Sequence, residues 1–408
     1  MMVRRVEKHI IKASDSMYPM LKSFCRLSKN LYNHANYLMR QSFFSTGSIP
    51  NYNMLDKLLK TDTQYPDYQS MPTAQTAQQT LRCLTSCWKA YFQALNAYRK
   101  NPSKFTGCPR PPKFLKKSGY YTLILTNQNC KLADGVIRFP KTFRGFEIPF
   151  LNASRPNFKS FQQVRISVMP FQLCVEIVYN IEIPNPRPDN KRYIGIDIGV
   201  DNLAAVVNTF HEKPFVINGR PLKSMNQYYN KRRAEMKSNL EKQNRQRTSK
   251  RLRGFDIKRD AKINDYMHKA SRRIIDYCVE HDVSIIIIGK NDGWKQSARL
   301  GKCDNQSFCS IPHAQFIDML TYKANEYGIS VITTEESYTS GTSFIDDEFP
   351  VKSNYKKSRR VKRGLFQSNK GVLINADVNG AYQIVKKVIP DFRWDRGCVL
   401  HPYIVNCA

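Results

Sequence analysis

The sequence lacks any pair of cysteines in a CxxC arrangement, although it contains eleven cysteines among 408 residues. Their number is odd and they are scattered, so neither a disulfide framework nor a zinc ribbon is supported. No run of about 18 consecutive apolar residues occurs, which argues against a membrane-spanning helix and a membrane partner. Residues 1–15 also lack the apolar core of a signal peptide. We therefore expect a cytosolic or nuclear protein, cytoplasmic and nucleoid-associated if the host is prokaryotic.

Acidic residues are scarce as well. The chain has 33 Asp and Glu against 65 Lys and Arg, a formal net charge of +32. Solubility does not require such an excess, whereas a polyanionic partner does, and nucleic acid is the commonest one. With 41% apolar residues, the chain is long enough for two or three domains that each bury a core.

The first half alternates between helix and strand signals. Residues 3–11 predict an opening strand, and apolar residues at helical spacing predict a long helix over 16–44. A polar loop is expected next, followed by a second helix that begins near Pro72 and ends at Lys100. Short strands with turns are predicted over 120–183, numerous enough for a small barrel that the opening strand could join.

Three segments concentrate the positive charge. In residues 101–121, prolines exclude a helix and basic residues alternate with aromatic ones, which suits phosphate contact and base stacking as well as a solvated linker. Residues 231–273 hold sixteen Lys and Arg against five Asp and Glu, more than a solvated helix face usually carries. Residues 340–372 form a third, lysine-rich and serine-rich segment. The nucleic-acid-binding residues that we predict are Lys104, Arg110, Lys113, Lys116, Lys117, Arg232, Arg233, Arg245, Arg247, Arg251, Arg253, Lys269, Lys356, Lys357, Arg359 and Arg360.

The second half has the pattern of an α/β sheet. The Pro-rich residues 183–192 predict a domain boundary. A hairpin is expected over 193–207, with a tight turn at 199–202. The β-branched run 284–290 predicts a strand buried on both faces, and a helix and a further strand follow it over 312–340. This alternation indicates a sheet with at least some parallel strands.

Acidic side chains stand at the ends of several of these elements. Asp197 lies inside a strand between two isoleucines, and Asp377 directly precedes a predicted helix. Glu335 and Glu336 end the strand that begins near Ile329. Taken singly, Asp197 could be satisfied by turn amides and Asp377 could cap its helix. Gathered above one sheet, however, carboxylates repel one another unless hard cations such as Mg²⁺ or Mn²⁺ neutralise them, and two such ions support phosphodiester hydrolysis.

Four motifs occur in the second half in a defined order. They are GIDIGVDNLAAV at 195–206, IIIIGKNDGWKQ at 285–296, the segment from Asn305 to Ser340 that ends in YTS, and INADVNGAYQIV at 374–385. Together they resemble the transposon-encoded OrfB/TnpB proteins, compact RNA-guided DNA endonucleases from which type V CRISPR effectors descend. The resemblance covers essentially residues 190–390, and the first half agrees with it in layout.

The resemblance implies an α+β multidomain fold. An RNase H-like RuvC nuclease domain would follow a β-barrel wedge domain, of the oligonucleotide-binding kind, into which a helical recognition domain is inserted. The implied partners are a guide RNA from the transposon end and target double-stranded DNA beside a short adjacent motif; no protein partner is indicated. The corresponding ranges are 1–15 and 101–190 for the wedge, 16–100 for the recognition domain, 191–390 for the nuclease with a basic helical insert at about 210–280 and a basic loop at about 340–372, and 391–408 for a C-terminal tail.

The second acid of the family departs from its usual position here. Asp197 matches the first RuvC acid and Asp377 the third, and together with a second acid they would bind two Mg²⁺ or Mn²⁺ ions. The family usually has Glu directly after the apolar strand, where this chain has Gly, Lys and Asn before Asp292. Some members take the acid from the strand before YTS, which offers Glu335 or Glu336. Strand alternation favours Glu336 slightly, and Asp292 is a weaker third candidate.

Many members of the family also carry a four-cysteine zinc finger directly after the YTS motif. Residues 337–364 contain no cysteine. We therefore expect no structural zinc here, and we expect the basic loop to make whatever nucleic-acid contacts that finger would have made.

The sequence thus predicts a Mg²⁺-dependent RNA-guided DNA endonuclease. Two alternatives share its motifs: a guide-RNA-directed DNA-binding regulator that no longer cuts, and a miniature type V CRISPR effector. The displaced second acid keeps the regulator open, while the presence of both Asp197 and Asp377 favours cleavage.

Overall fold

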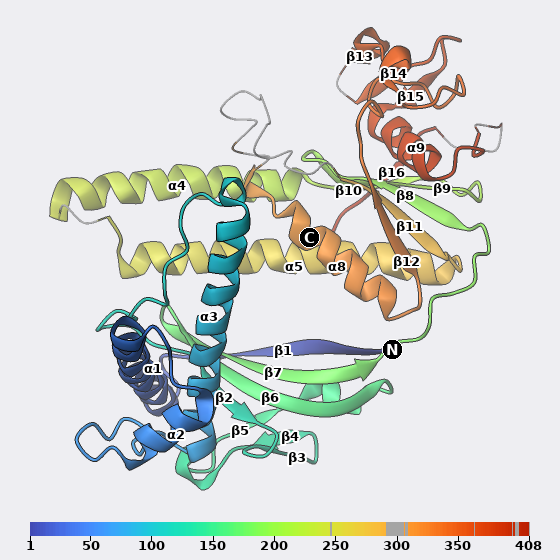
Figure 1. Ribbon diagram of the computed structural model, residues 1–408. Coiled ribbons are helices and arrows are strands. Elements are labelled where there is room, and N and C mark those ends of the chain that lie inside the picture. The colour runs from blue at the N-terminus through green and yellow to red at the C-terminus, as the bar shows by residue number, and fades with distance from the viewer. Residues whose placement is uncertain are drawn as a thin grey trace. The chain divides into compact units, whose positions relative to one another are not determined.

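The computed structural model describes residues 1–244, 247–290, 306, 309–362, 364–393, 395 and 400–407 (Figure 1). Its contacts divide the chain into two compact units. One unit is Met2–Glu182, and the other is Ile183–Ala408 together with Met1. The division falls at the start of the Pro-rich stretch 183–192.

The strands of the first unit pair into two antiparallel sheets. The larger sheet has the order β1-β7-β6-β2 and the smaller one β3-β4-β5. The opening strand was expected at 3–11 and pairs along its whole length with β7, so it joins these strands, as the sequence allowed. A closed barrel is not confirmed, because the described pairings leave the two sheets separate. The strands are β1 (Met2–Lys12), β2 (Leu123–Thr126), β3 (Lys131–Ala133), β4 (Val136–Arg138), β5 (Glu147–Pro149), β6 (Phe158–Met169) and β7 (Gln172–Glu182).

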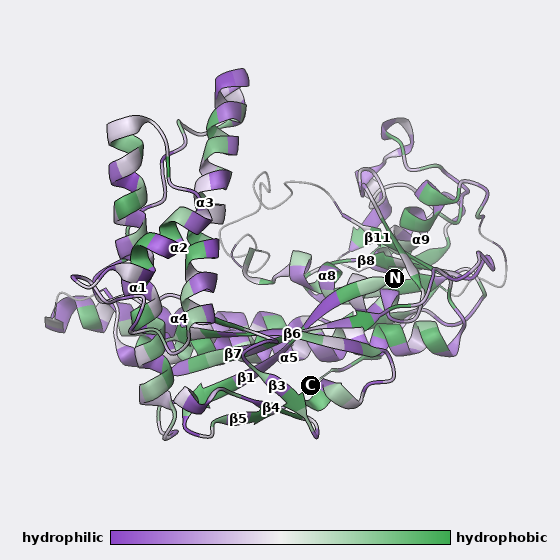
Figure 2. Cartoon of the chain, turned by 60° about the horizontal axis from the view of Figure 1, so that its bottom comes forward, coloured by the Kyte–Doolittle hydropathy of each residue, from purple (hydrophilic) through white to green (hydrophobic). Residues whose placement is uncertain are grey.

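Helices α1 (Tyr18–Thr46), α2 (Tyr52–Thr61) and α3 (Ala74–Lys100) complete this unit. α1 and α3 each show hydrophobic and hydrophilic patches along their length (Figure 2), and Leu21, Leu31, Leu81, Leu84 and Trp88 are fully buried. The prediction of a polar loop between the two long helices was wrong, because the side chain of Asn51 caps α2 there by accepting from the Met54 amide. The helix expected near Pro72 begins at Ala74, where Thr73 forms a capping box.

The second unit is built on a six-stranded mixed sheet of order β12-β11-β8-β9-β10-β16. β8 (Tyr193–Asp197), β9 (Asn202–Asn208) and β10 (Phe215–Asn218) form an antiparallel meander. β11 (Ile285–Gly289) lies parallel to β8, and β12 (Ser330–Thr334) lies parallel to β11. This confirms the predicted hairpin and the predicted parallel strands. The C-terminal residues also join the sheet, since β16 (Tyr403–Val405) pairs with β10.

Helices cover both faces of this sheet, which explains why the isoleucine run is apolar throughout. On β11, Ile286 and Ile288 pack in one core cluster with α5 (Lys250–Glu280) and α8 (His313–Asn325). Ile287 points to the other face and packs with α9 (Ala376–Val388). α4 (Arg220–Asn244) packs against α5. None of the described helices is long and apolar enough to cross a membrane.

Residues 340–375 are more ordered than the predicted basic loop. They contain a three-stranded antiparallel sheet of β13 (Arg360–Lys362), β14 (Leu365–Gln367) and β15 (Leu373–Asn375). Phe344 and Phe366 are fully buried beside α9 and anchor the segment. Single-turn 3₁₀ helices occupy Pro102–Lys104, Lys141–Phe143, Leu151–Ser154, Lys352–Asn354 and Lys357–Arg359.

Candidate active site

Asp197 lies at the carboxyl end of β8, where the strand emerges from the core of the sheet. Its neighbour Ile196 is fully buried, whereas Asp197 itself is only half buried and opens toward a pocket. Gly380 of α9 makes room for it, because a Cβ atom there would lie 2.6 Å from Asp197 Oδ2. A side chain at position 380 would therefore displace the carboxylate or the helix.

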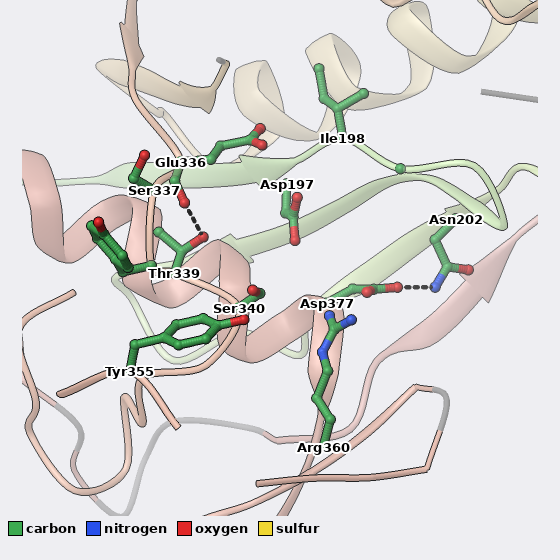
Figure 3. A pocket seen from close by; sticks show the side chains of 12 residues that line it. Asp197, Ile198, Asn202, Glu336, Ser337, Thr339, Ser340, Tyr355, Arg360 and Asp377 are labelled. Atoms are coloured by element: carbon green, nitrogen blue, oxygen red, sulfur yellow. Dashed lines mark hydrogen bonds between the residues drawn. The ribbon is translucent and has the colours of Figure 1, made fainter. Parts of the chain in front are cut away.

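Asp377 lies in the first turn of α9 and does not cap that helix. The cap is Asn375, whose Oδ1 accepts from the amides of Asp377 and Val378 at 3.0 and 3.1 Å. The alternative reading of Asp377 as a helix cap was thus wrong, and its carboxylate is available for another role. Asn202, at the start of β9, donates through Nδ2 to Asp377 Oδ2 at 2.7 Å and holds the carboxylate in one orientation (Figure 3).

Glu336 lies just beyond β12, which ends at Thr334. Its side chain lines the same pocket as Asp197 and Asp377. The neighbouring strand β11 ends in Gly289, where a Cβ atom would lie 2.6 Å from Glu336 Cγ and 2.8 Å from Oε1. The space beside the end of β11 is thus filled by the Glu336 side chain.

The two adjacent glutamates have different surroundings. The side chain of Glu335 is 69% exposed, and its Oε2 lies 4.0 Å from Lys387 Nζ. It does not line the pocket. Strand alternation suggested Glu336, but both glutamates lie beyond the last residue of β12. Glu336 is therefore distinguished from Glu335 by its position in the pocket and not by the alternation of side chains along a strand. Asp292, the third candidate, lies outside the described residues.

The three carboxylates reach one open pocket of about 540 Å³ from three separate elements (Figure 3). Asp197 comes from the centre of the sheet, Asp377 from α9 and Glu336 from the end of β12. The Arg360 guanidinium rises toward the aspartates from β13. The other lining residues are Ile198, Gly199, Asn202, Ser337, Tyr338, Thr339, Ser340 and Tyr355.

Asp197 is affected both by its burial and by the two neighbouring acids. Burial raises the pKa of Asp197 well above its usual range, and the nearby Glu336 and Asp377 raise it further, while Arg360 opposes them. Burial also raises the pKa of Glu336 to about 7, against the opposing charge of Lys387. Ionising both Asp197 and Glu336 at neutral pH is therefore unfavourable in the protein alone, and a bound cation would favour their ionised forms.

The donor set fits hard divalent cations. Three carboxylates supply oxygen ligands of the type that Mg²⁺ and Mn²⁺ prefer. Within the described parts of the chain, no three Asp, Glu, His or Cys side chains lie close enough together to hold one metal ion. Asp197 is the acid whose pKa is raised by both of the others.

Two family models match the second half of the chain. Residues 175–295 match the OrfB model, described as "Probable transposase", and residues 313–384 match the Cas12f1-like TNB domain. The TnpB-like protein ORF457 of Acidianus two-tailed virus is 25% identical over 407 residues, which cover 90% of this chain and 83% of that protein. The chain is OrfB/TnpB-like. The resemblance predicted from its motifs is thereby confirmed.

Solved structures give similar matches at lower identity. The Cas12f1 chain of a complex with sgRNA and target DNA is 14% identical, with a TM-score of 0.36 over 93% of this chain and 98% of that one. A Cas12f chain from a CRISPR ternary complex is 12% identical, with a TM-score of 0.38 over 90% of this chain and 81% of that one.

Most of the predicted nucleic-acid-binding residues of the OrfB/TnpB-like chain lie at its surface, but some have acidic partners. Arg232 pairs with Glu235, Arg233 with Asp256 and Lys269 with Asp265. Arg245 lies outside the described residues. The exposed residues without a recorded ion pair are Lys104, Arg110, Lys113, Lys116, Lys117, Arg247, Arg251, Arg253, Lys356, Lys357 and Arg360.

Arg359 corrects one of these predictions. Its side chain is 6% exposed, and its guanidinium pairs with both carboxylate oxygens of Glu348, with Nη2 at 2.6 Å from Oε1. The same nitrogen donates to Asn369 Oδ1 at 2.8 Å. Its donors face the protein, so Arg359 stabilises the 340–375 segment and is not placed to contact nucleic acid.

The sequence reasoning missed the residues that position the acids. Asn202, Gly289 and Gly380 carry no charge, so nothing in their residue type points to a role beside the acids. Asn202 could have been noticed as a polar side chain at the mouth of the hairpin that carries Asp197. The two glycines have no comparable signal, because their role depends on which side chain comes to fill the space beside them.

Proposed function

We propose that this OrfB/TnpB-like chain is an RNA-guided DNA endonuclease. A guide RNA from the transposon end would direct it to double-stranded DNA beside a short adjacent motif, where it would cleave by metal-dependent phosphodiester hydrolysis. The observation that carries the proposal is the convergence of Asp197, Glu336 and Asp377 on one pocket from three separate elements.

The residues present suit this chemistry. When bound, two Mg²⁺ or Mn²⁺ ions would supply an activated water and charge stabilisation of the leaving oxygen. Asp197, Glu336 and Asp377 are the residues that would hold these ions. Asn202 holds Asp377 in position, so that less ordering is needed when a ligand binds. Arg360, exposed at the pocket rim, is placed to contact a substrate phosphate.

The two structural units support the domain assignment that the resemblance implies. We assign the mixed sheet with its three acids to a RuvC-like nuclease domain at 191–390. Helices α4 and α5 form the basic insert, and the antiparallel sheets with α1 to α3 form the wedge and recognition domains. The guide RNA and the target DNA are the proposed partners of the basic surfaces, as a net charge of +32 favours.

The neighbouring glutamates provide a matched test. In a plasmid cleavage assay with co-expressed flanking RNA and Mg²⁺, Glu336→Gln should lower the cleavage rate by about 10² to 10³, since it removes one charge-stabilising group. Glu335→Gln, one residue away and exposed, should cleave close to the wild-type rate. Asp197→Asn and Asp377→Asn should abolish cleavage while guide-RNA binding persists.

The opposite pattern would refute the site. If Glu336→Gln cleaved at the wild-type rate and Glu335→Gln lost cleavage, the second acid would be Glu335 and not Glu336. If the unmodified chain bound its RNA and target yet never cut DNA in Mg²⁺ or Mn²⁺, the regulator that no longer cuts would replace the endonuclease.

A further inference from the structure

The polar side of α1 holds the extended basic segment by its backbone. Asn33 makes two hydrogen bonds with Leu115: its Nδ2 donates to the carbonyl at 3.0 Å, and its Oδ1 accepts from the amide at 2.8 Å. Asn36 and Arg40 both donate to the Pro112 carbonyl, at 3.1 and 3.0 Å. Lys29 donates to the Lys117 carbonyl at 3.3 Å. These four side chains recur along α1 at helical spacing, so one helix holds three backbone positions within six residues of non-helical chain.

This arrangement leaves the basic side chains outside. Lys113, Lys116 and Lys117 are exposed, as is Arg110 just before them. Because α1 already orders the backbone of the segment, binding of a ligand to these lysines would cause little further loss of backbone entropy. The segment is therefore a preorganised row of positive charges, not the solvated linker that its composition also allowed.

An aromatic pocket lies where this segment ends. The Tyr121 amide donates to the Cys25 carbonyl at 3.0 Å, which places Tyr120 beside the first turns of α1. Lys22 Nζ lies 5.3 Å from the ring centre of Tyr18 and 5.5 Å from that of Tyr120. The guanidinium carbon of Arg26 lies 5.7 Å from the ring centre of Tyr120. Two tyrosine rings and two cations thus share one site.

The site is a cavity of about 330 Å³, within the size range of pockets that take small organic ligands. Its lining contains no carboxylate, and Tyr18, Lys22 and Tyr120 are half buried. Such a pocket suits a flat, electron-rich ring attached to a negative group. The lining residues are Tyr18, Pro19, Lys22, Ser23, Arg26 and Tyr120.

We propose that this pocket binds an unpaired base of an RNA strand whose phosphates lie along the lysine row. Aromatic rings and guanidinium planes stack on bases that are splayed out of a strand, while lysines contact the adjacent phosphates. RNA is the occupant that the geometry favours, since its loops and ends expose single bases whereas a DNA duplex keeps its bases stacked inside. The inference depends on the proposed RNA binding but not on cleavage.

Binding of a labelled single-stranded RNA to the full chain in EDTA tests the proposal without cutting. Tyr120→Ala should bind the single strand about fivefold to a hundredfold more weakly, as expected for the loss of one stacked base. Tyr120→Phe, which keeps the ring, should bind like the wild type and shows that the pocket still folds. Tyr37→Ala is the control, because Tyr37 is a 52% exposed tyrosine on α1, the helix that lines the pocket, but does not itself line it.

Further arms separate the possible occupants. Double-stranded RNA of the same sequence should lose little affinity in Tyr120→Ala, and single-stranded DNA should bind the wild type more weakly than single-stranded RNA. Equal binding by Tyr120→Ala and Tyr37→Ala would overturn the pocket, and a preference for single-stranded DNA would overturn its assignment to RNA. If Tyr120→Ala binds RNA like the wild type and the wild type cleaves DNA, this inference alone is refuted. If Tyr120→Ala binds RNA more weakly but the wild type never cleaves DNA, the endonuclease proposal alone is refuted.

Discussion

At the scale of single residues, the second acid that we propose, Glu336, follows a different strand from the one that the resemblance implies. In the family pattern the second acid follows the apolar strand, and at that point this chain has Gly289. β11 and β12 are parallel neighbours, and Gly289 pairs with Thr334, two residues before Glu336. A carboxylate from the adjacent strand end can therefore occupy the space that a side chain at 289 would have filled.

Gly289→Ala tests this compensation. The added Cβ would lie 2.5 Å from Ile384 Cδ1 and 2.6 Å from Glu336 Cγ, so the glutamate must move. A displacement of about 1 Å costs on the order of 100-fold in rate, and we expect cleavage to fall by that factor while RNA binding is retained. Gly254→Ala on α5 is the control, since its Cβ would meet nothing within 4 Å and a helical Gly→Ala change is slightly stabilising. Equal cleavage by the two variants would contradict the account.

The pKa of Glu336 predicts how stability depends on pH. Its value in the folded chain is about 7, above the usual 4.5, so between these values the folded state holds a proton that the unfolded state has lost. The contribution of Glu336 to the free energy of unfolding is therefore fully present below pH 4.5 and is lost as the pH rises to 7. The loss is up to about 3 kcal/mol, at roughly 1.4 kcal/mol per pH unit.

Thermal melting of the metal-free chain between pH 5 and 8 measures the effect. The melting temperature should fall more steeply with pH in the wild type than in Glu336→Gln, which has no proton to lose. Added Mg²⁺ should raise the melting temperature more at pH 8 than at pH 6, because the ion binds the ionised carboxylate. Parallel pH curves for wild type and variant would show that Glu336 does not titrate in this range.

At the scale of elements, residues 340–375 are organised without cysteine ligands. Phe344 stacks on Tyr382 of α9 with ring centres 4.6 Å apart, and the Arg359–Glu348 pair ties the segment together from within. This segment supplies Tyr355 and Arg360 to the rim of the pocket. Its stability is therefore linked to the geometry of the site through direct contact.

Arg359→Met tests whether this arginine is structural. Breaking a buried ion pair leaves Glu348 without its partner and should cost about 3–5 kcal/mol of stability, visible as a lower melting temperature. Adding Glu348→Gln should recover part of the loss, because no uncompensated charge then remains. A variant with unchanged melting temperature and weakened RNA binding would instead restore Arg359 to the nucleic-acid-binding residues.

At the scale of the whole molecule, the net charge of +32 is the dominant property. Several basic residues form ion pairs with acidic residues of the chain, as Lys269 does with Asp265 at 3.1 Å. Others, such as Arg251 and Arg253 on α5, have no recorded ion pair and are exposed. Only the second group is expected to release many counterions when a polyanion binds.

Salt titrations distinguish the two groups. Replacing Arg251 and Arg253 together by Gln should reduce the slope of log affinity for RNA against log salt by about 2, one for each phosphate contact. Lys269→Gln, the paired control, should change the slope by less than one. Equal changes per residue would mean that the internal ion pairs open when RNA binds.

The sequence alone predicted much of the order of elements, though not α2 or the sheet of β13 to β15, and it singled out two of the acids that line the pocket. The spacing of apolar residues and the local composition depend only on neighbouring residues. The hairpin of Asp197, the buried strand of isoleucines and the basic helices could therefore all be predicted. The motifs around Asp197 and Asp377 likewise lie in short continuous segments, so the resemblance to OrfB/TnpB proteins can be seen in the sequence.

Only the tertiary structure separated Glu336 from Glu335, removed Arg359 from the binding surface and placed Asn202 on Asp377. Each of these depends on which residue fills an adjacent space or accepts a given hydrogen bond, and the paired residues lie 11 positions apart for Glu348 and Arg359 and 175 apart for Asn202 and Asp377. Local propensity cannot encode them, because the same side chain is a ligand, a surface charge or a buried ion pair according to what the fold brings beside it.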